Sequence, residues 1–215
     1  MPGATFRVPT QRPTDRGIRT DDLLESRCLV RTTRTKERFM QADHEIDDMS
    51  QQIEALKAKL SVARRRRPQE PVADYELTGS DGVPISLSAL FGEKDDLIVV
   101  HNMGRGCAYC TMWADGFNGV LPHLEDRAAF VVVSPDEPDV QATFTESRGW
   151  RFRMVSAAGS EFAHAMGFEE KSGEYMPGFS AFRRLPDGSI VRTGRDFFGP
   201  GDDYCSPWRL FDLLA

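Results

Sequence analysis

The two side chains best placed to do chemistry are Cys107 and Cys110, which are separated by two residues. They follow the apolar run 97–100 and a loop that contains Gly104 and Gly106. This order predicts a buried strand, a tight turn and a helix whose first turn holds Cys107. Unpaired N–H groups and the dipole at a helix N-terminus favour a thiolate. Cys110 would share the helical face of Cys107 and could resolve a disulfide that Cys107 forms.

Four neighbours of this pair are candidate supporting residues. Ala108 and Tyr109 lie between the cysteines, and Trp113 follows about one helical turn later. A tryptophan at such a position is more often part of the core or of a groove wall than a platform that binds a ligand. Arg105 precedes Cys107 by two residues, and its charge would favour the thiolate unless the guanidinium is simply solvated.

A C-x-x-C pair is also half of a typical zinc site, which needs two further ligands. The sequence has no second C-x-x-C and no H-x-x-x-H, so Cys205 and either His101 or His123 would have to meet the pair through the fold. We therefore favour redox chemistry without a bound metal or cofactor. We expect His101 to be structural, Cys205 to be a buried apolar residue and Cys28 to be a free thiol.

The elements that must position the pair follow from the apolar periodicity after residue 68. They are a hairpin at 75–77 and 83–87, a strand at 97–103, a helix at 107–124, a strand at 130–134, a helix at 138–148, a strand at 152–155, a helix at 160–166, a hairpin at 178–185 and 189–193, and a last apolar segment at 208–214. This order predicts an α/β, thioredoxin-like three-layer fold with a central mixed sheet.

The charge of the chain is unevenly distributed, which predicts a boundary near Pro68. Residues 1–67 hold 15 Lys and Arg against 10 Asp and Glu, whereas residues 68–215 hold 12 against 23. We expect a disordered N-terminus at 1–20, a helical arm at 21–67 and the thioredoxin-like domain at 68–215. The arginine run 64–67 suits a helix C-terminus better than a nucleic-acid site, because no aromatic residues alternate with it.

The arm carries a narrow apolar stripe whose spacings alternate between three and four residues. Its members are Phe39, Ala42, Ile46, Met49, Ile53, Leu56, Leu60 and Ala63. This is a heptad pattern, and such a face must be buried against a second copy, which would give a homodimer, or against the globular domain of the same chain.

The sequence favours a cytoplasmic protein without a membrane or nucleic-acid partner. No apolar run approaches the roughly 20 residues that span a bilayer. The N-terminal residues 1–20 carry arginines among Pro and Thr and lack the apolar core of a secretory signal.

Several stretches around the cysteines resemble a known family. They are residues 74–75, the turn 79–82 and the segments 87–91, 96–104, 106–110 and 113–119. Over most of residues 40–214 the chain is similar to the bacterial domain-of-unknown-function family of thioredoxin-like proteins often labelled predicted dithiol-disulfide oxidoreductases. The resemblance implies a thioredoxin-like fold in which Cys107 and Cys110 are the redox pair.

The resemblance has a further implication at Met176 and Pro177, which precede the strand predicted at 178–185. Thioredoxin-like proteins place a cis-proline at the start of that strand, beside the redox pair. We therefore predict a cis peptide bond between Met176 and Pro177, near Cys107. Without the fold, an ordinary trans bond would be expected there.

Together these features predict a thiol-disulfide oxidoreductase with Cys107 as nucleophile and Cys110 as resolving thiol. Its partners would be a protein or small-molecule thiol or disulfide and an electron donor that the sequence does not identify. Two alternatives stay open. One is a peroxide-reducing enzyme of the peroxiredoxin type, whose Thr-x-x-Cys pattern would require Thr or Ser where Gly104 stands. The other is a non-catalytic interaction module.

Overall fold

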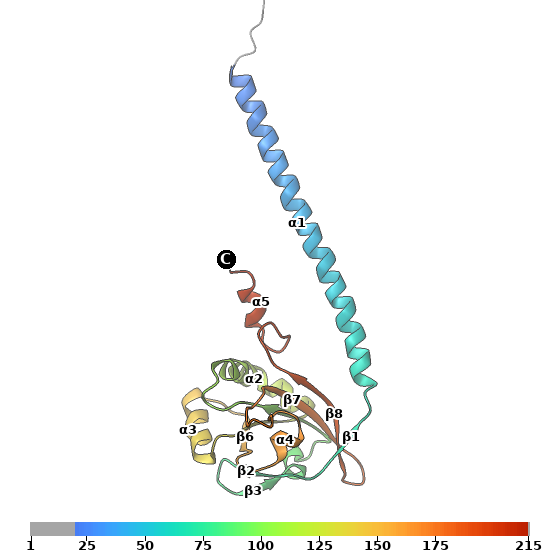
Figure 1. Ribbon diagram of the computed structural model, residues 1–215, viewed down its shortest axis with the longest axis vertical. Coiled ribbons are helices and arrows are strands. Elements are labelled where there is room, and N and C mark those ends of the chain that lie inside the picture. Colours follow the sequence, from blue (N-terminus) through green and yellow to red (C-terminus); the bar gives the residue numbers. More distant parts are fainter. Residues whose placement is uncertain (1–19, 215) are drawn as a thin grey trace, which may run out of the picture. The chain divides into compact units, whose positions relative to one another are not determined.

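The computed structural model describes the backbone of residues 20–214 and the side chains of residues 36–214 (Figure 1). The predicted disordered segment 1–20 therefore lies outside the described residues except for Thr20, and so does the side chain of Cys28. The chain divides into two compact units, Met1–Ser61 and Val62–Ala215. Among the described helices we find none with the length and apolar character needed to cross a membrane.

Helix α1 (Thr20–Arg65) is a single helix of 46 residues. It ends shortly before Pro68, because the residue that precedes a proline is disfavoured in the helical region. Arg64 and Arg65 occupy its last turn, where cations interact favourably with the helix dipole. The apolar stripe predicted on this helix lies in water, since its six large side chains are 48% to 67% exposed.

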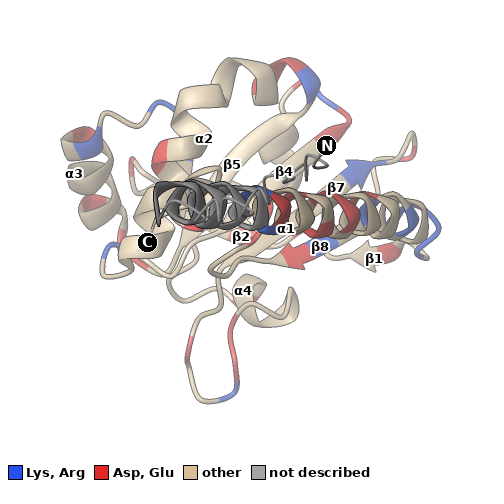
Figure 2. Ribbon diagram, turned by 90° about the horizontal axis from the view of Figure 1, so that it is seen from above, with Lys and Arg blue, Asp and Glu red and all other residues tan. Residues whose placement is uncertain are grey.

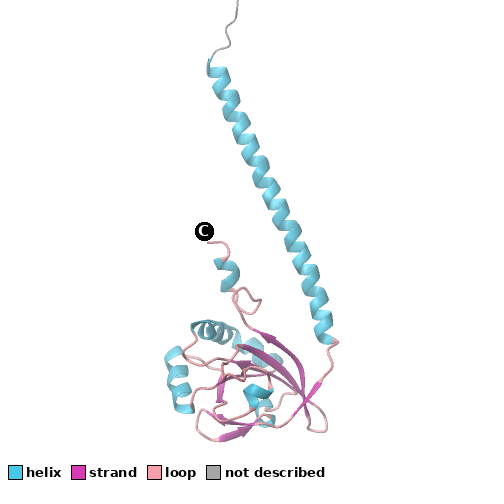
Figure 3. Cartoon of the chain, in the orientation of Figure 1, coloured by secondary structure: helices cyan, strands magenta, loops and turns pink. Residues whose placement is uncertain are grey.

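The second unit is built around one sheet of eight strands in the order β1-β8-β7-β4-β5-β6-β2-β3. Figure 3 shows strands in magenta and helices in cyan. The strands are β1 (Glu70–Val72), β2 (Glu76–Gly79), β3 (Pro84–Ser86), β4 (Asp96–His101), β5 (Ala129–Ser134), β6 (Arg153–Ser156), β7 (Gly178–Arg184) and β8 (Ile190–Phe197). Strands β4, β5 and β6 are parallel, and β7 and β8 are antiparallel to their neighbours. This arrangement confirms the predicted mixed sheet and thioredoxin-like fold.

Helices cover both faces of this sheet. The helices are the 3-10 turn η1 (Ser88–Phe91) and the α-helices α2 (Ala108–Arg127), α3 (Pro138–Arg148), α4 (Phe162–Ala165) and α5 (Pro207–Phe211). Figure 2 shows α2 and α4 on opposite sides of the sheet. Along β4, Leu97 and Val99 pack with η1 and α4, whereas Val100 packs with α2. The period of two along a strand thus produces two cores and three layers.

The sequence patterns did not predict two details of the sheet. Strand β1 has only three residues, and it joins the sheet by pairing with β8, from Glu70 opposite Arg192 to Val72 opposite Ile190. Strand β8 continues to Phe197, four residues beyond its predicted end, because its pairing with β7 continues past an irregularity at Ala181 and Phe182. Both features depend on a partner strand more than on local sequence.

The predicted cis bond between Met176 and Pro177 is wrong. Every peptide bond in the described part of the chain is trans. The N–H of Met176 donates to the carbonyl of Phe168 at 2.8 Å, and the carbonyl of Pro177 accepts from the N–H of Phe198 at 2.8 Å. Both backbone groups are therefore satisfied by the trans bond, which an X-Pro peptide prefers by about 0.5–1 kcal/mol.

Candidate active site

Cys107 is the N-cap residue of α2, so the helix begins at Ala108, one position after its predicted start at Cys107. Its backbone is extended, with φ −94° and ψ 104°, and its sulfur accepts a hydrogen bond from the N–H of Cys110 at 3.1 Å. A helix N-cap normally uses a Ser, Thr, Asp or Asn oxygen for this bond. Here a sulfur fills the role, so the free N–H groups and the dipole of a 20-residue helix face the Cys107 sulfur.

The two cysteines differ sharply in their surroundings. Cys107 is partly exposed, whereas Cys110 is buried, with 3% of its surface accessible. Burial, and after it the hydrogen bond with Cys107, raise the pKa of Cys110 to about 12. Cys110 is therefore a neutral thiol near pH 7. Both cysteines are free, so the structure holds the pair without a disulfide bond between them.

The loop before Cys107 is held by two side chains that the sequence patterns did not single out. The Oδ1 atom of Asn102 accepts from the N–H of Gly104 at 2.8 Å, and Oδ2 of Asp136 accepts from the N–H of Arg105 at 2.8 Å. Asn102 follows β4 and Asp136 follows β5. The carboxyl ends of adjacent parallel strands meet at one sheet edge, and this signal could have identified both residues.

Gly104 is required by the geometry of this loop. Its φ of +97° is a conformation that residues with a Cβ rarely adopt. A Cβ built at this position would lie 2.9 Å from Oδ2 of Asp136. The Thr or Ser of the peroxiredoxin pattern therefore does not fit this backbone at position 104.

The supporting residues predicted from the sequence occupy different environments. The side chain of Arg105 is exposed, and Ala108 is exposed at the first helical position. Tyr109 is 53% exposed, whereas Trp113 is buried and its indole N–H lies 3.4 Å from Oδ1 of Asp202. Trp113 therefore lies in the core, with 6.3 Å between its ring centroid and that of Tyr109.

An aromatic wall beside the pair is completed by the C-terminal helix. The ring of Trp208 lies edge-on to Tyr109, with 5.3 Å between ring centroids, and 6.1 Å from the ring of Trp113. No local sequence pattern predicts this contact, because Trp208 lies almost 100 residues after Tyr109. Tyr109 thus packs against Trp208, while about half of its surface remains exposed.

Cys205 lies in the same apolar cluster as Cys110 and Trp113. It is buried as expected, and burial raises the pKa of its thiol, as does the neighbouring carboxylate of Asp202. Throughout the described residues, no three His, Cys, Asp or Glu side chains form a group that could hold a metal ion.

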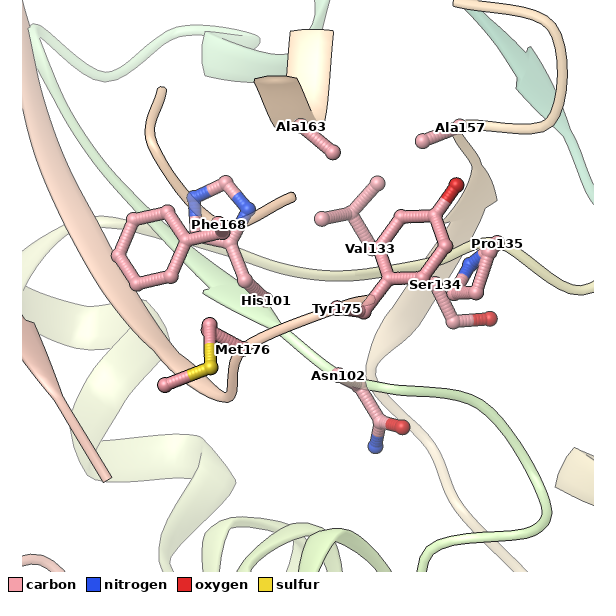
Figure 4. A pocket seen from close by; sticks show the side chains of 10 residues that line it. All are labelled: His101, Asn102, Val133, Ser134, Pro135, Ala157, Ala163, Phe168, Tyr175 and Met176. Atoms are coloured by element: carbon pink, nitrogen blue, oxygen red, sulfur yellow. The ribbon is translucent and has the colours of Figure 1, made fainter. Parts of the chain in front are cut away.

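A small pocket of about 10 Å³ lies at the carboxyl ends of β4 and β5 (Figure 4). Neither Cys107 nor Cys110 lines it. The residues that do are His101, Asn102, Val133, Ser134, Pro135, Ala157, Ala163, Phe168, Tyr175 and Met176. Met176 and Asn102 therefore line the same pocket, and Asn102 is also the residue that binds the N–H of Gly104 in the loop before Cys107. The pocket has room for about one water molecule.

His101 is a buried structural histidine, as expected. Its ring stacks on Phe168 at a centroid distance of 3.8 Å, and its Nε2 lies 3.1 Å from Oγ of Ser180. Burial lowers its pKa from 6.5 to about 3, with a smaller contribution from the charge of Arg192. The folded protein therefore keeps this imidazole neutral, and its Nδ1 atom has no hydrogen-bond partner among the residues that the structure describes.

This neutral histidine should make stability depend on pH. In the unfolded chain His101 gains a proton below about pH 6.5, whereas in the folded chain it does so only near pH 3. Its contribution to stability is therefore complete above pH 6.5 and is lost as the pH falls toward 3, at up to about 1.4 kcal/mol per pH unit. We expect His101→Gln, which cannot titrate, to flatten the free energy of unfolding between pH 6.5 and 5. Urea unfolding of both proteins measures this, and equal slopes would contradict the assignment.

Comparison with solved structures finds similar proteins at low identity. Peroxidoxin BcpB from Mycobacterium tuberculosis is 27% identical, with a TM-score of 0.46, over 57% of this chain and 80% of that one. A peroxiredoxin-like protein from Aquifex aeolicus is 16% identical, with a TM-score of 0.49, over 60% and 74%. The mitochondrial 2-Cys peroxiredoxin from Plasmodium falciparum is 11% identical, with a TM-score of 0.49, over 66% and 90%.

Comparison with curated proteins finds no match. A family model described as "Bacterial protein of unknown function (DUF899)" matches residues 30–215. The match includes the arm from residue 30 onward, the loop 102–107 and the whole sheet. The resemblance carried by the residues around Cys107 and Cys110 is thereby confirmed, and the chain belongs to the DUF899 family of bacterial proteins.

Proposed function

We propose that this protein is a thiol-disulfide oxidoreductase in which Cys107 is the nucleophile and Cys110 the resolving thiol. The observation that carries the proposal is the asymmetry of the pair. The Cys107 sulfur caps α2 and is partly exposed, whereas the Cys110 sulfur is buried and its pKa is raised to about 12. One sulfur is therefore placed to attack, and the other is held back in neutral form.

The proposed reaction transfers two electrons. The Cys107 thiolate attacks one sulfur of a substrate disulfide, forms a mixed disulfide and releases the other substrate sulfur as a thiolate. Cys110 then loses its proton and attacks the Cys107 sulfur. The mixed disulfide breaks, the second substrate thiolate leaves, and Cys107 and Cys110 are joined by a disulfide. The reverse sequence would oxidise a substrate dithiol.

The order of these steps follows from what raises the pKa of Cys110. Besides burial, both the hydrogen bond and the charge of Cys107 raise it. Formation of the mixed disulfide converts Cys107 to a neutral sulfur, which removes the charge contribution. The resolving thiol thus becomes easier to deprotonate only after the nucleophile has reacted.

The exposed side of the pair suggests where a substrate disulfide docks. Tyr109 lies between the cysteines in the chain, and half of its surface is open. A protein or small-molecule disulfide that approaches Cys107 would pack on this ring, while Trp113 and Trp208 support it from behind. Electrons would return to the pair from a thiol donor.

A redox titration tests the proposal. We would equilibrate the Cys28→Ser/Cys205→Ser protein with dithiothreitol buffers and count free thiols by alkylation and mass spectrometry. We expect a two-electron transition between about −270 and −120 mV, the range of this fold. Thiols that stay reduced throughout would contradict the proposal and favour the interaction module. Oxidation by hydrogen peroxide with repeated turnover, but no exchange with disulfides, would favour the peroxide-reducing alternative.

A further inference from the structure

The arm presents an apolar face that the proposed function does not use. The stripe on α1 exposes Phe39, Ile46, Met49, Ile53, Leu56 and Leu60, each by 48% to 67%. An isolated helix that leaves such a stripe in water gains little from it, and a heptad stripe is the surface by which helices pair. We propose that this face binds a second copy of the same chain and that the two α1 helices run antiparallel.

The first argument for this orientation is the distribution of charge along α1 (Figure 2). Residues 36–50 hold five acidic and two basic side chains, whereas residues 54–65, the end of the helix, hold one acidic and four basic side chains. A parallel pair would place the two basic ends side by side. An antiparallel pair places each acidic half against the basic half of the second copy, which is the electrostatically favourable arrangement.

The second argument is the size of the apolar side chains. In one antiparallel register, each of the eight stripe residues faces a stripe residue of the second copy, and these pairs are of four kinds. Across the pair, these layers join Phe39 with Ala63, Ala42 with Leu60, Ile46 with Leu56, and Met49 with Ile53. Each alanine then faces a large side chain, which fills the layers evenly. In a parallel pair every residue would face its own copy, so that Phe39 would meet Phe39 and Ala42 would meet Ala42.

The third argument comes from the side chains that flank the stripe. In the same antiparallel register, Asp43 of one copy lies beside Lys57 of the second copy, and Glu45 beside Lys59, each pair occurring twice. Lys57 also lies 3.7 Å from Glu54 of its own helix, an exposed contact that contributes little. Within α1 the same register also places Lys36 beside Arg64, a repulsive pair outside the stripe, so that two kinds of attractive pair stand against one repulsive kind. The parallel register would instead give one attractive pair, Arg38 with Asp43, and one repulsive pair, Lys59 with Arg64.

A cross-linking experiment distinguishes the two orientations in the full chain. In a background with the four native cysteines replaced by serine, Ala42→Cys and Leu60→Cys would be made separately. The antiparallel register brings residue 42 of one copy to residue 60 of the other. It keeps two copies of residue 42 about 27 Å apart along the axis. We therefore expect oxidised dimers only when the two variants are mixed. Cross-linking of either variant alone would overturn the orientation.

Charge exchange provides a second test that leaves the stripe intact. We expect Asp43→Lys/Glu45→Lys to raise the dimer dissociation constant at least tenfold, because each of the four attractive pairs becomes repulsive. Adding Lys57→Glu and Lys59→Glu to the same chain should return the dissociation constant to its wild-type value, because the attractive pairs form again with their signs reversed. Asp47→Lys/Asp48→Lys, which makes the same change of charge beside the stripe, is the matched control and should weaken the dimer less. Sedimentation velocity measures all three.

Two results would overturn the proposal. The first is a wild-type chain that sediments as a monomer at every concentration up to about 100 μM, a range that covers weak homodimers. The second is a fourfold charge variant that fails to regain the dimer while its circular dichroism retains the helix content of the wild-type chain.

Discussion

Replacing Cys110 by serine should convert the protein into a trap that stays covalently joined to its substrates. Cys107 keeps its place at the start of α2 and still attacks a disulfide, but no second sulfur is present to release the product. Covalent adducts should therefore accumulate on non-reducing gels and disappear with dithiothreitol. Replacing Cys107 should reduce adduct formation to background, because Cys110 is buried and its pKa is raised to about 12.

The matched control for this pair of variants is Cys205→Ser. Cys205 is buried in the same apolar cluster, and burial raises its pKa as well, but it has no role in the proposed reaction. Its replacement should leave both the wild-type cycle and the Cys110→Ser trap unchanged. If Cys107→Ser traps partners while Cys110→Ser does not, the roles of the two cysteines are reversed. If neither traps anything, the oxidoreductase proposal fails.

Replacing Gly104, which lies three residues before Cys107, should lower both the stability of the fold and the rate of disulfide exchange. At φ +97° a residue with a Cβ is strained by about 1–3 kcal/mol, and the new Cβ would also approach Asp136 to 2.9 Å. Asp136 cannot move freely, because its Oδ2 accepts from the N–H of Arg105. We therefore expect Gly104→Thr to lower the free energy of unfolding and to slow disulfide exchange by at least tenfold, although it completes the Thr-x-x-Cys pattern.

Gly106→Ala is the matched control in the same loop. Gly106 does not have a positive φ, and a Cβ placed there would meet nothing within 4 Å. Its replacement by alanine should change the free energy of unfolding by less than about 0.5 kcal/mol. Chemical denaturation measures the free energy of unfolding of both variants. The rate at which each reduced variant reduces a disulfide reagent measures disulfide exchange. Equal effects of Gly104→Ala and Gly106→Ala would show that the backbone of Gly104 does not hold the redox loop.

Local sequence determined the elements whose signals lie within a few residues. Helix α3 was predicted with its observed bounds, Pro138–Arg148, because a proline begins it and Gly149 ends it in a left-handed conformation with φ +66°. The buried strands β4 and β5 were predicted within one or two residues from their apolar runs. The C-x-x-C pair and its place at the start of a helix were equally local, since one strand, one turn and one helix follow each other in the chain.

Tertiary structure decided how the site around that pair is built. The hydrogen bond from Arg105 to Asp136 joins residues 31 positions apart, and Trp208 packs on Tyr109 from the far end of the chain. The trans bond before Pro177 is the ordinary local preference of an X-Pro peptide, and the cis bond that the resemblance implied is absent from the described residues. Periodicity and turn propensity report only what neighbouring residues prefer. Contacts between distant segments depend on how the sheet orders its strands, and the chain specifies that order only when the whole core packs.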